Sequence, residues 1–335
     1  MRALVTGGGG FVGGAIVDAL LARGDTVRSF ARSDYPALRA KGVETVRGDL
    51  TDAAAVLAAC EGVDVVFHVA ARVGYHGDPA EYDAINVRGT QNVVDACREQ
   101  GVQRLVYTST PSVVHSRAGT SGLDETAPYP TDWIADYPRT KAAAETIVLG
   151  ADDAGVRTVS IRPRGVWGPG DTQLFPRLVT WAQTGQLKRI GDADPLQDFA
   201  YIDNVVAAHL LAEETLRTTP DIAGGNAYFI TNGEPLGVWT MMEKTLACAG
   251  LALPSRRVPI GVARVAATVI ETLWRWFGLA SEPRLTRYKL DVLTQPCWFD
   301  ITAARRDLGY TPTVTTEEGL AALKAWYEAG GLDTP

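Results

Sequence analysis

Tyr137 and Lys141 are the residues whose types and spacing most directly suggest chemistry. They stand four positions apart, which on a helix places both side chains on one face in adjacent turns. Pro138 suits the first turn of a helix, so Tyr137 is expected at the helix entry. A neighbouring ammonium favours the ionised form of a phenol and makes it a usable acid and base near neutral pH. The pair therefore predicts proton transfer at a substrate oxygen.

A run of hydroxyl side chains lies upstream of this pair. Thr108, Ser109, Thr110 and Ser112 follow or end an expected strand at residues 104–108. In an open α/β sheet, ligands bind beyond the carboxyl ends of the strands. A hydroxyl from this run, with Thr110 as the candidate, could therefore hold a carbonyl oxygen close to the tyrosine.

A glycine cluster follows the first expected strand and opens the first expected helix. Gly7, Gly10 and Gly13 stand three residues apart. Glycine at these positions permits a tight turn, close approach of the backbone to a pyrophosphate, and close packing of helix on strand. The N–H groups at the start of the helix then face the phosphate charge. The cluster predicts a dinucleotide site.

The end of the second expected strand indicates which dinucleotide binds. An enzyme that uses NAD usually carries Asp or Glu there for the ribose hydroxyls. Here the first acid is Asp34, and it is preceded by Arg32 and Ser33, which can bind a 2′-phosphate. These residues predict NADP. Asp49 and Leu50, after the third strand, either bracket the adenine or form a plain turn.

Short apolar runs alternate with helix-period segments through the first half of the chain. Strands are expected at 3–6, 26–30, 44–46, 63–68, 104–108 and 158–161, and helices at 11–22, 53–59, 82–100 and from Tyr137. This alternation predicts an α/β fold, a Rossmann-type doubly wound parallel sheet. We expect residues 1–165 to form the cofactor domain and 166–335 a smaller, mostly helical substrate region, with a segment near 198–232 returning to the sheet.

Composition excludes several classes of function. The 335 residues carry a net charge of −7, which argues against nucleic-acid binding. Four scattered cysteines and four scattered histidines show no metal-ligand spacing, so no metal site is expected. The first residues do not read as a signal peptide, and the default expectation is a cytoplasmic protein.

Residues 260–279 form the most amphipathic segment of the C-terminal third. Val262, Val269 and Trp276 recur at helical spacing, and no uncharged run approaches the length that spans a bilayer. Three interpretations remain open. The segment packs on the protein's own core or forms a lid, which is the preferred interpretation; it rests weakly on a membrane; or it forms a dimer surface.

Taken together, these motifs resemble the extended short-chain dehydrogenase/reductase family over nearly the whole chain. The resemblance also includes Asn86-Val87-x-Gly89-Thr90, Arg162-Pro163 and Gly168-Pro169-Gly170-Asp171. The ending Trp298-Phe299-Asp300-Ile301 and the Tyr107–Pro111 run resemble the 3β-hydroxysteroid dehydrogenase-like branch. Within that branch the chain looks most similar to the 2-alkyl-3-oxoalkanoate reductases, which use NADPH.

The resemblance implies a role for each matching residue. Tyr137 becomes the general acid/base, Lys141 holds the nicotinamide ribose, and Thr110 replaces the usual Ser. Val69-Ala70-Ala71 departs from the family pattern. The cofactor NADP(H) is expected to contact Gly7, Gly10, Phe11, Val12, Gly13, Arg32, Ser33, Asp49, Leu50, Ala70, Ala71, Thr108, Tyr137, Lys141, Pro163 and Val166. Relatives dimerise through two helices, here 82–100 and 137–152, so a homodimer is expected.

The expected reaction is reduction of a ketone to a secondary alcohol on a small lipophilic substrate, a 2-alkyl-3-oxoalkanoate. The candidates for binding it are Arg72, Tyr75, His76, Ser112 and Trp133. The alternative is a 3β-hydroxysteroid or sterol dehydrogenase acting oxidatively. A nucleotide-sugar epimerase or dehydratase is disfavoured because Gln197 stands where such enzymes carry an arginine for the diphosphate. A non-catalytic NADP-binding sensor is disfavoured because Thr110, Tyr137 and Lys141 are intact.

Overall fold

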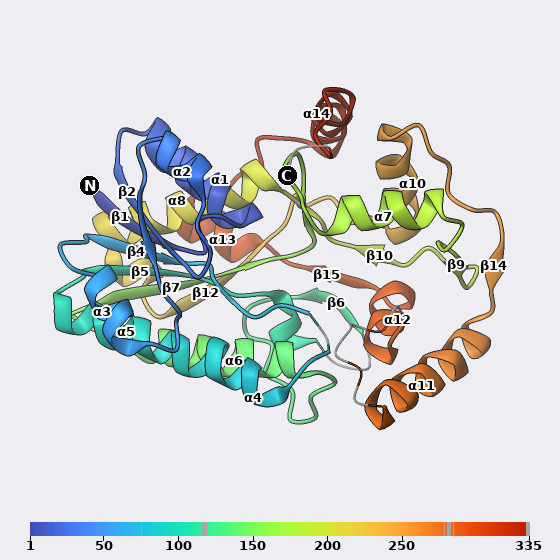
Figure 1. The fold of residues 1–335 in the computed structure, drawn as a ribbon, viewed down its shortest axis with the longest axis horizontal. Helices are drawn as coiled ribbons and strands as arrows, with labels where there is room; N and C mark the ends of the chain where they lie inside the picture. Colours follow the sequence, from blue (N-terminus) through green and yellow to red (C-terminus); the bar gives the residue numbers. More distant parts are fainter. Residues whose placement is uncertain (75, 116–118, 278, 280–282, 284, 333–335) are drawn as a thin grey trace.

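A seven-stranded parallel sheet forms the larger of two lobes in the computed structural model, which describes residues 1–74, 76–115, 119–277, 279, 283 and 285–332 (Figure 1). The strand order is β3-β2-β1-β4-β5-β7-β12, and each neighbouring pair is parallel. The strands are β1 Arg2–Thr6, β2 Thr26–Ala31, β3 Glu44–Arg47, β4 Val65–His68, β5 Arg104–Thr108, β7 Arg157–Pro163 and β12 Asn226–Ile230. The predicted α/β Rossmann-type sheet is confirmed.

Helices cover both faces of this sheet (Figure 1). One face carries α1 Phe11–Ala22, α8 Ile202–Thr218 and α13 Thr302–Leu308, with α2 Pro36–Ala40 beside α1. The other face carries α3 Ala53–Ala59, α4 Pro79–Tyr82, α5 Gly89–Gln100 and α6 Asp136–Leu149. Because α5 and α6 contact one another, they form the surface through which the predicted homodimer would assemble; that assembly stays a prediction.

The helix expected at 82–100 differs from the single regular helix that its periodicity suggests. The structure has α4, then a π-helical turn η1 at Asp83–Arg88, then α5. The wider turn brings Asn86 into a buried position, where its Nδ2 donates to the Thr140 Oγ1 at 3.0 Å. Single-turn π segments often occur at functional sites, and this one connects two parts of the site described below.

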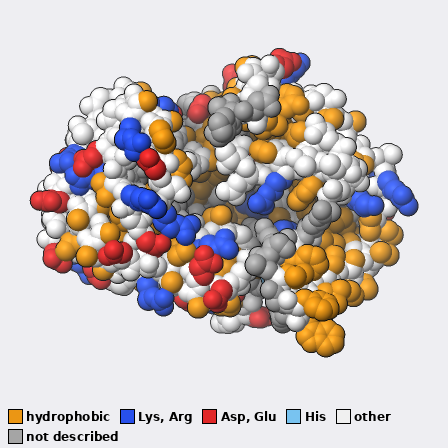
Figure 2. Space-filling model, in the orientation of Figure 1, with side chains coloured by type: hydrophobic (Ala, Val, Ile, Leu, Met, Phe, Trp, Pro, Cys, Tyr) orange, Lys and Arg blue, Asp and Glu red, His pale blue; other side chains and the backbone are white. Residues whose placement is uncertain are grey.

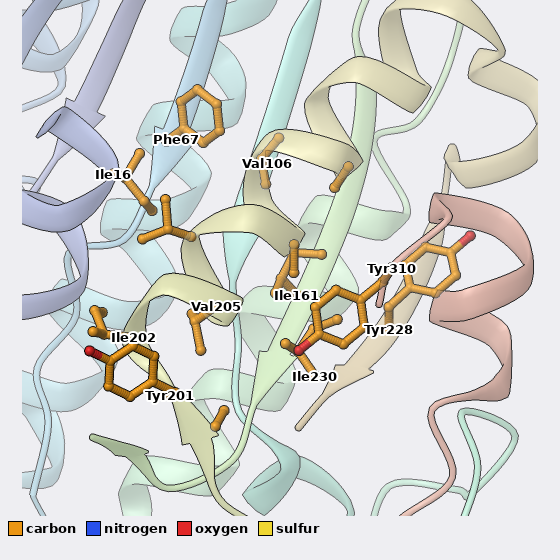
Figure 3. Packing of buried hydrophobic residues seen from close by; sticks show 14 of the residues in the cluster. Ile16, Phe67, Val106, Ile161, Tyr201, Ile202, Val205, Tyr228, Ile230 and Tyr310 are labelled. Atoms are coloured by element: carbon orange, nitrogen blue, oxygen red, sulfur yellow. The ribbon is translucent and has the colours of Figure 1, made fainter. Parts of the chain in front are cut away.

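One core cluster lies between the sheet and α8, and a second lies between the sheet and the helices α3, α5 and α6. Val205 of α8 and Ile161 of β7 are fully buried, and Figure 3 shows them among the side chains packed beneath the strands. The chain returns to this sheet through α8 and β12, and the Tyr310 hydroxyl donates to the Thr231 carbonyl at 2.9 Å beyond β12. The C-terminal part is thereby anchored to the strand ends that carry the site.

The smaller lobe combines segments from both halves of the chain. Its four-stranded sheet has the order β13-β10-β15-β6. The strands are β6 Thr120–Leu123, β10 Leu196–Gln197, β13 Leu236–Gly237 and β15 Cys297–Phe299, and two-stranded pairs join β8 Val166–Trp167 to β11 Ala200–Tyr201 and β9 Arg189–Ile190 to β14 Arg257–Val258. The helices are α7 Leu174–Gln183, α10 Val238–Cys248, α11 Ile260–Trp276, α12 Arg287–Thr294 and α14 Thr316–Glu328; short helices η2 Pro111–Val114 and α9 Pro220–Ala223 complete the chain.

Three further observations concern the described residues as a group. None of their helices has the length and apolar character needed to cross a bilayer. No three of their His, Cys, Asp or Glu side chains come together in a way that could hold a metal ion. All four cysteines are free and buried.

Candidate active site

The glycine loop connects β1 to α1 in a conformation that requires glycine at two positions. Gly7 has a φ of 72°, which side chains disfavour, and its N–H donates to the Phe30 carbonyl at 2.9 Å. A Cβ on Gly13 would lie 2.2 Å from the Gly7 oxygen, so helix and strand could not pack as they do. The loop leads directly into Phe11 and Val12, whose N–H groups belong to the first, unpaired turn of α1. This is suitable for a pyrophosphate.

A chain of buried hydrogen bonds ties β1 to β4 and to the catalytic helix. The Thr6 hydroxyl accepts the N–H groups of Val69 and Ala70, each at 3.1 Å, so its own proton is directed to His68 Nδ1 at 2.8 Å. His68 Nε2 then donates to Thr90 Oγ1 at 3.0 Å. Burial, with a smaller effect of the Lys141 charge, lowers the pKa of His68 to about 3. His68 is therefore a neutral structural link rather than an acid or base for the reaction.

Asn86 continues this network. Its side chain accepts the Arg72 N–H at 2.7 Å and donates to the Arg72 carbonyl at 3.0 Å. Its remaining N–H reaches Thr140, one residue before Lys141. The loop after β4 is thus fixed to α6, and the motif that the sequence identified as Asn86-Val87-x-Gly89-Thr90 acts as the connector.

The predicted catalytic pair lies in the first turns of α6. Tyr137 is half-buried, and Lys141 is buried below it. The Lys141 Nζ donates to the Thr108 carbonyl at 2.6 Å and lies 4.1 Å from the centroid of the Tyr107 ring. Burial lowers the pKa of Lys141 to about 7, and the carboxylate of Glu145 opposes this shift. The Lys141 ammonium is therefore held at the carboxyl end of β5.

Thr110 and Ser112 lie together just past β5. The two hydroxyl oxygens are 3.0 Å apart, and the Thr110 Oγ1 accepts the Ser112 N–H at 3.3 Å. In the contact between the two hydroxyls either one can donate, so the Thr110 proton points to a substrate oxygen when Ser112 is the donor. The short helix η2, which Thr110 caps, holds that hydroxyl at the strand end where a substrate carbonyl is expected.

A buried ion pair supports the catalytic helix from behind. The Glu145 carboxylate accepts from Arg162 Nη2 at 2.6 Å, from the Ser160 hydroxyl at 2.6 Å and from the Tyr129 hydroxyl at 2.7 Å. Burial raises the pKa of Glu145, but Arg162 and Ser160 outweigh this effect and hold it below its usual value. The pair joins α6 to β7, so it fixes the helix that carries Tyr137 and Lys141 on the sheet.

The residues near the end of β2 form a cationic surface. Arg32 and Ser33 are exposed, and Arg47 donates to the Arg32 carbonyl at 3.0 Å. Ser33 also lines a polar pocket of about 250 Å³ between β2 and β3. Asp34, the first acid after the strand, forms an ion pair with Arg39, which lowers the pKa of Asp34. Arg39 lies in α2, and Arg47 ends β3. They were not identified from the sequence, because neither follows the end of β2 directly.

The turn after β3 has a clear local role. The Asp49 carboxylate accepts both the N–H and the hydroxyl of Thr51, at 2.9 and 2.8 Å, and the Thr51 N–H is the largest cause of its lowered pKa. Leu50 is buried, and its carbonyl accepts from Asn92 at 2.8 Å. A role of Asp49 and Leu50 at adenine stays a prediction.

The predicted substrate residues are dispersed around the loop after β4 and the strand β5. Arg72 forms an ion pair with Glu81 at 3.2 Å and lies over the Tyr82 ring. His76 Nε2 lies 2.8 Å from the Leu279 carbonyl. Trp133 is half-buried against the core, and Tyr75 lies outside the described residues. The roles of these side chains in binding the substrate stay predictions.

Arg164 is the residue that the sequence missed. It follows β7 directly, is half-buried, and its Nη2 donates to Gln197 Oε1. Burial is the larger cause that lowers the pKa of His115 to about 4, and the positive charge of Arg164 adds to it. His115 is buried, and its Nε2 has no hydrogen-bond partner within the described part of the chain. Arg164 thus lies against Gln197, a contact between residues 33 positions apart that sequence spacing did not reveal.

Comparison with known proteins agrees with this geometry. A family model described as the 3-beta hydroxysteroid dehydrogenase/isomerase family matches residues 4–260. A protein of Stenotrophomonas maltophilia (strain K279a) named 2-alkyl-3-oxoalkanoate reductase is 47% identical over 328 residues, covering 97% of this chain and 99% of the relative. A 3-beta-hydroxysteroid dehydrogenase of Mycolicibacterium neoaurum is 38% identical over 339 residues, covering 97% and 91%.

Solved structures share the fold over almost the whole chain. The crystal structure of gox2253 superposes with a TM-score of 0.80 at 28% identity, covering 98% of each chain. MoeE5 in complex with UDP-glucose and NAD superposes with a TM-score of 0.75 at 25% identity, covering 98% of this chain and 99% of MoeE5.

Proposed function

Because the chain belongs to the 3-beta hydroxysteroid dehydrogenase/isomerase family, an oxidoreductase family, we propose that it reduces a 2-alkyl-3-oxoalkanoate to the 2-alkyl-3-hydroxyalkanoate with NADPH. The observation that carries the proposal is the 47% identity, over nearly the full length of both chains, to a relative of that name. The positions of Thr110, Tyr137 and Lys141 at one strand end support it, since they provide a carbonyl donor, an acid and a cation.

Each of these residues has a defined part in ketone reduction. A nicotinamide cofactor, when bound, supplies the hydride that the carbonyl carbon accepts. Thr110 donates a hydrogen bond to the carbonyl oxygen, and Tyr137 delivers the proton that completes the alcohol. Lys141, held by the Thr108 carbonyl, orients the ribose and places positive charge beside the phenolate that Tyr137 becomes.

Arg32 and its surroundings favour NADPH over NADH. A 2′-phosphate near Ser33 would meet Arg32 and Arg47. Two acids lie nearby: Asp34 is paired with Arg39, and Asp49 accepts from Thr51 and lies within reach of the Arg32 charge. Charge-assisted hydrogen bonds to a phosphate are stronger than neutral ones. NADH lacks this phosphate, so it gains nothing from the two arginines.

Replacing Arg32 with alanine is expected to raise the KM for NADPH by about 10- to 100-fold, the equivalent of ~1.5–3 kcal/mol for a lost charge-assisted hydrogen bond. The KM for NADH should stay unchanged, so the ratio of the two constants measures the effect. Arg98→Ala removes an exposed arginine that pairs with Asp153 on the far side of the lobe and serves as the matched control. An equal loss for both cofactors would contradict the assignment of Arg32.

Arg164 is proposed to bind the carboxylate of the substrate. It lies beyond the carboxyl end of β7, beside β5 in the sheet, and therefore on the same edge as Thr110. Neutral His115 stands near it with an unpaired Nε2 in the described structure, so a carboxylate there would receive an ion pair and a hydrogen bond. A keto acid presents the anion that this arrangement fits, whereas a sterol does not.

The assay that tests the proposal offers a racemic 2-alkyl-3-hydroxyalkanoate with NADP⁺ and follows nicotinamide absorbance. We expect turnover of the acid and a kcat/KM about 10-fold or more lower for its methyl ester, because the ester cannot pair with Arg164. Arg164→Gln should reduce the rate on the acid to that on the ester. Relatives named 3-beta-hydroxysteroid dehydrogenase make a 3β-hydroxysterol with NAD⁺ the necessary comparison. Turnover of the sterol alone would overturn the proposed substrate.

A further inference from the structure

The helix α11 exposes its apolar face instead of burying it. Side chains at helical spacing are solvent-exposed, from 39% for Leu273 to 83% for Trp276. The exposed apolar set comprises Val262, Val265, Val269, Leu273, Trp276 and the following Phe277. Figure 2 shows a patch of hydrophobic side chains at the lower right, where Figure 1 places α11. Within the described part of the chain this apolar face does not pack on the protein's own core, and the lid part of the preferred interpretation stays a prediction.

The opposite face of α11 explains this orientation. Ala263 and Ala267 are buried there, and Ala263 packs in a cluster with Leu290 of α12. Because these alanine side chains are small, α11 and α12 can approach closely. The larger apolar side chains of α11 then lie on the solvent-exposed face. The hydroxyls of Thr268 and Thr272 donate to carbonyls of their own helix, at 2.9 and 2.7 Å, so they do not need water as a partner. The outer face can therefore be desolvated at low cost.

Charge distinguishes this region from the rest of the chain. Residues 251–295 contain seven Lys and Arg but only three Asp and Glu, a net +4 in a chain that carries −7. Arg264 of α11 is exposed. Glu271, the acidic residue of α11, forms an ion pair with Arg287, with 2.6 Å between Oε2 and Nε. Asp192, near the start of the helix, is engaged by Arg257 at 2.7 Å. Glu271 and Asp192 are thus each paired with an arginine, and Arg264 stays exposed on the helix that carries the apolar stripe.

We propose that α11 lies in the surface of an anionic phospholipid bilayer, with its exposed apolar face in the lipid. An amphipathic helix with arginines beside an apolar stripe, and aromatic residues at its end, is the arrangement that binds such surfaces. Trp276 and Phe277 would sit at the headgroup level, where aromatic rings are favoured. A second copy of this chain would present the same positive segment to the patch, so like charges oppose that occupant.

The position of α11 gives this docking a consequence for the site. His76, in the loop after β4, contacts the Leu279 carbonyl just beyond the helix, and the same loop is fixed to the catalytic helix through Asn86. The bilayer would therefore lie next to the loop that borders the active site. A lipophilic substrate dissolved in the membrane would reach the site without crossing bulk water. The docking itself does not depend on the identity of that substrate.

Co-flotation of the full-length protein with vesicles tests the proposal. We expect binding to phosphatidylcholine vesicles that contain phosphatidylglycerol, reduced by added salt, and much weaker binding to phosphatidylcholine alone. The double variant Val265→Asp, Val269→Asp should lose binding at least about 10-fold, because both side chains enter the lipid. It should keep its rate on soluble substrate, since both side chains are exposed in the described structure.

Ile222→Asp is the matched control, because it places a charge at an exposed apolar position of α9. It should float like the unchanged protein. Brominated lipids should quench the unchanged protein more than Trp276→Phe. The proposal is overturned if the protein ignores anionic vesicles, if Ile222→Asp and the double variant lose binding equally, or if the double variant only abolishes self-association.

Discussion

Phenylalanine at position 137 is expected to lower kcat by about 10²- to 10⁴-fold, the usual contribution of general acid–base catalysis. The Tyr137→Phe variant keeps the ring and loses only the hydroxyl that delivers the proton. NADPH affinity should stay unchanged, because the glycine loop, Arg32 and Lys141 remain in place. Steady-state rates and a fluorescence titration with NADPH separate the two quantities.

Tyr327→Phe provides the control for this change. Its ring packs edge-on against Phe175 at 5.9 Å, away from the strand ends that form the site. Turnover should match that of the unchanged protein. If Tyr137→Phe turns over at the full rate, the chain either uses another proton donor or binds the cofactor without catalysis, as the sensor alternative would require.

Glu145→Ala is expected to lower the free energy of unfolding by about 3–5 kcal/mol, because it leaves Arg162 as a buried charge without its partner. The carboxylate is fully buried, and Ser160 and Tyr129 lose an acceptor as well. Urea unfolding followed by circular dichroism measures the change. Activity at low temperature should fall too, since the pair holds α6 on β7.

An exposed pair on the same lobe provides the comparison. Glu214 pairs with Arg217 on α8, where solvent screens the interaction, so Glu214→Ala should leave the urea midpoint nearly unchanged. The double variant Glu145→Leu, Arg162→Met removes both buried charges and should recover part of the lost stability. Equal effects of Glu145→Ala and Glu214→Ala would mean that the buried pair does not stabilise the fold.

Several structural features arise from contacts that no local pattern reveals. His76 meets Leu279 across 203 positions of sequence. The Asp34–Arg39 pair shows that the acid after β2 need not repel a phosphate. Arg164 donates to Gln197 across 33 positions of sequence. The His76–Leu279 and Arg164–Gln197 contacts join distant segments of the chain, so only the packing of those segments decides them.

Periodicity had a similar limit at α11. It indicated that Val262, Val269 and Trp276 share one face of a helix, and the structure confirms this spacing. It could not indicate whether that face is buried or exposed, because this depends on which face of α11 packs against α12. Alanines at 263 and 267 make the closer contact, so the larger apolar side chains point outward.

The sequence by itself determined the sheet, the glycine loop and the Tyr137–Lys141 pair. These rest on residues close together in the chain, where spacing fixes geometry: three-residue steps through a turn, four-residue steps on a helix. Only the tertiary structure decided the state of Lys141, the neighbours of Arg164 and the exposure of α11. Burial, charge pairing and exposure are properties of residues brought together from distant segments, so they exist only once the strands and helices have packed.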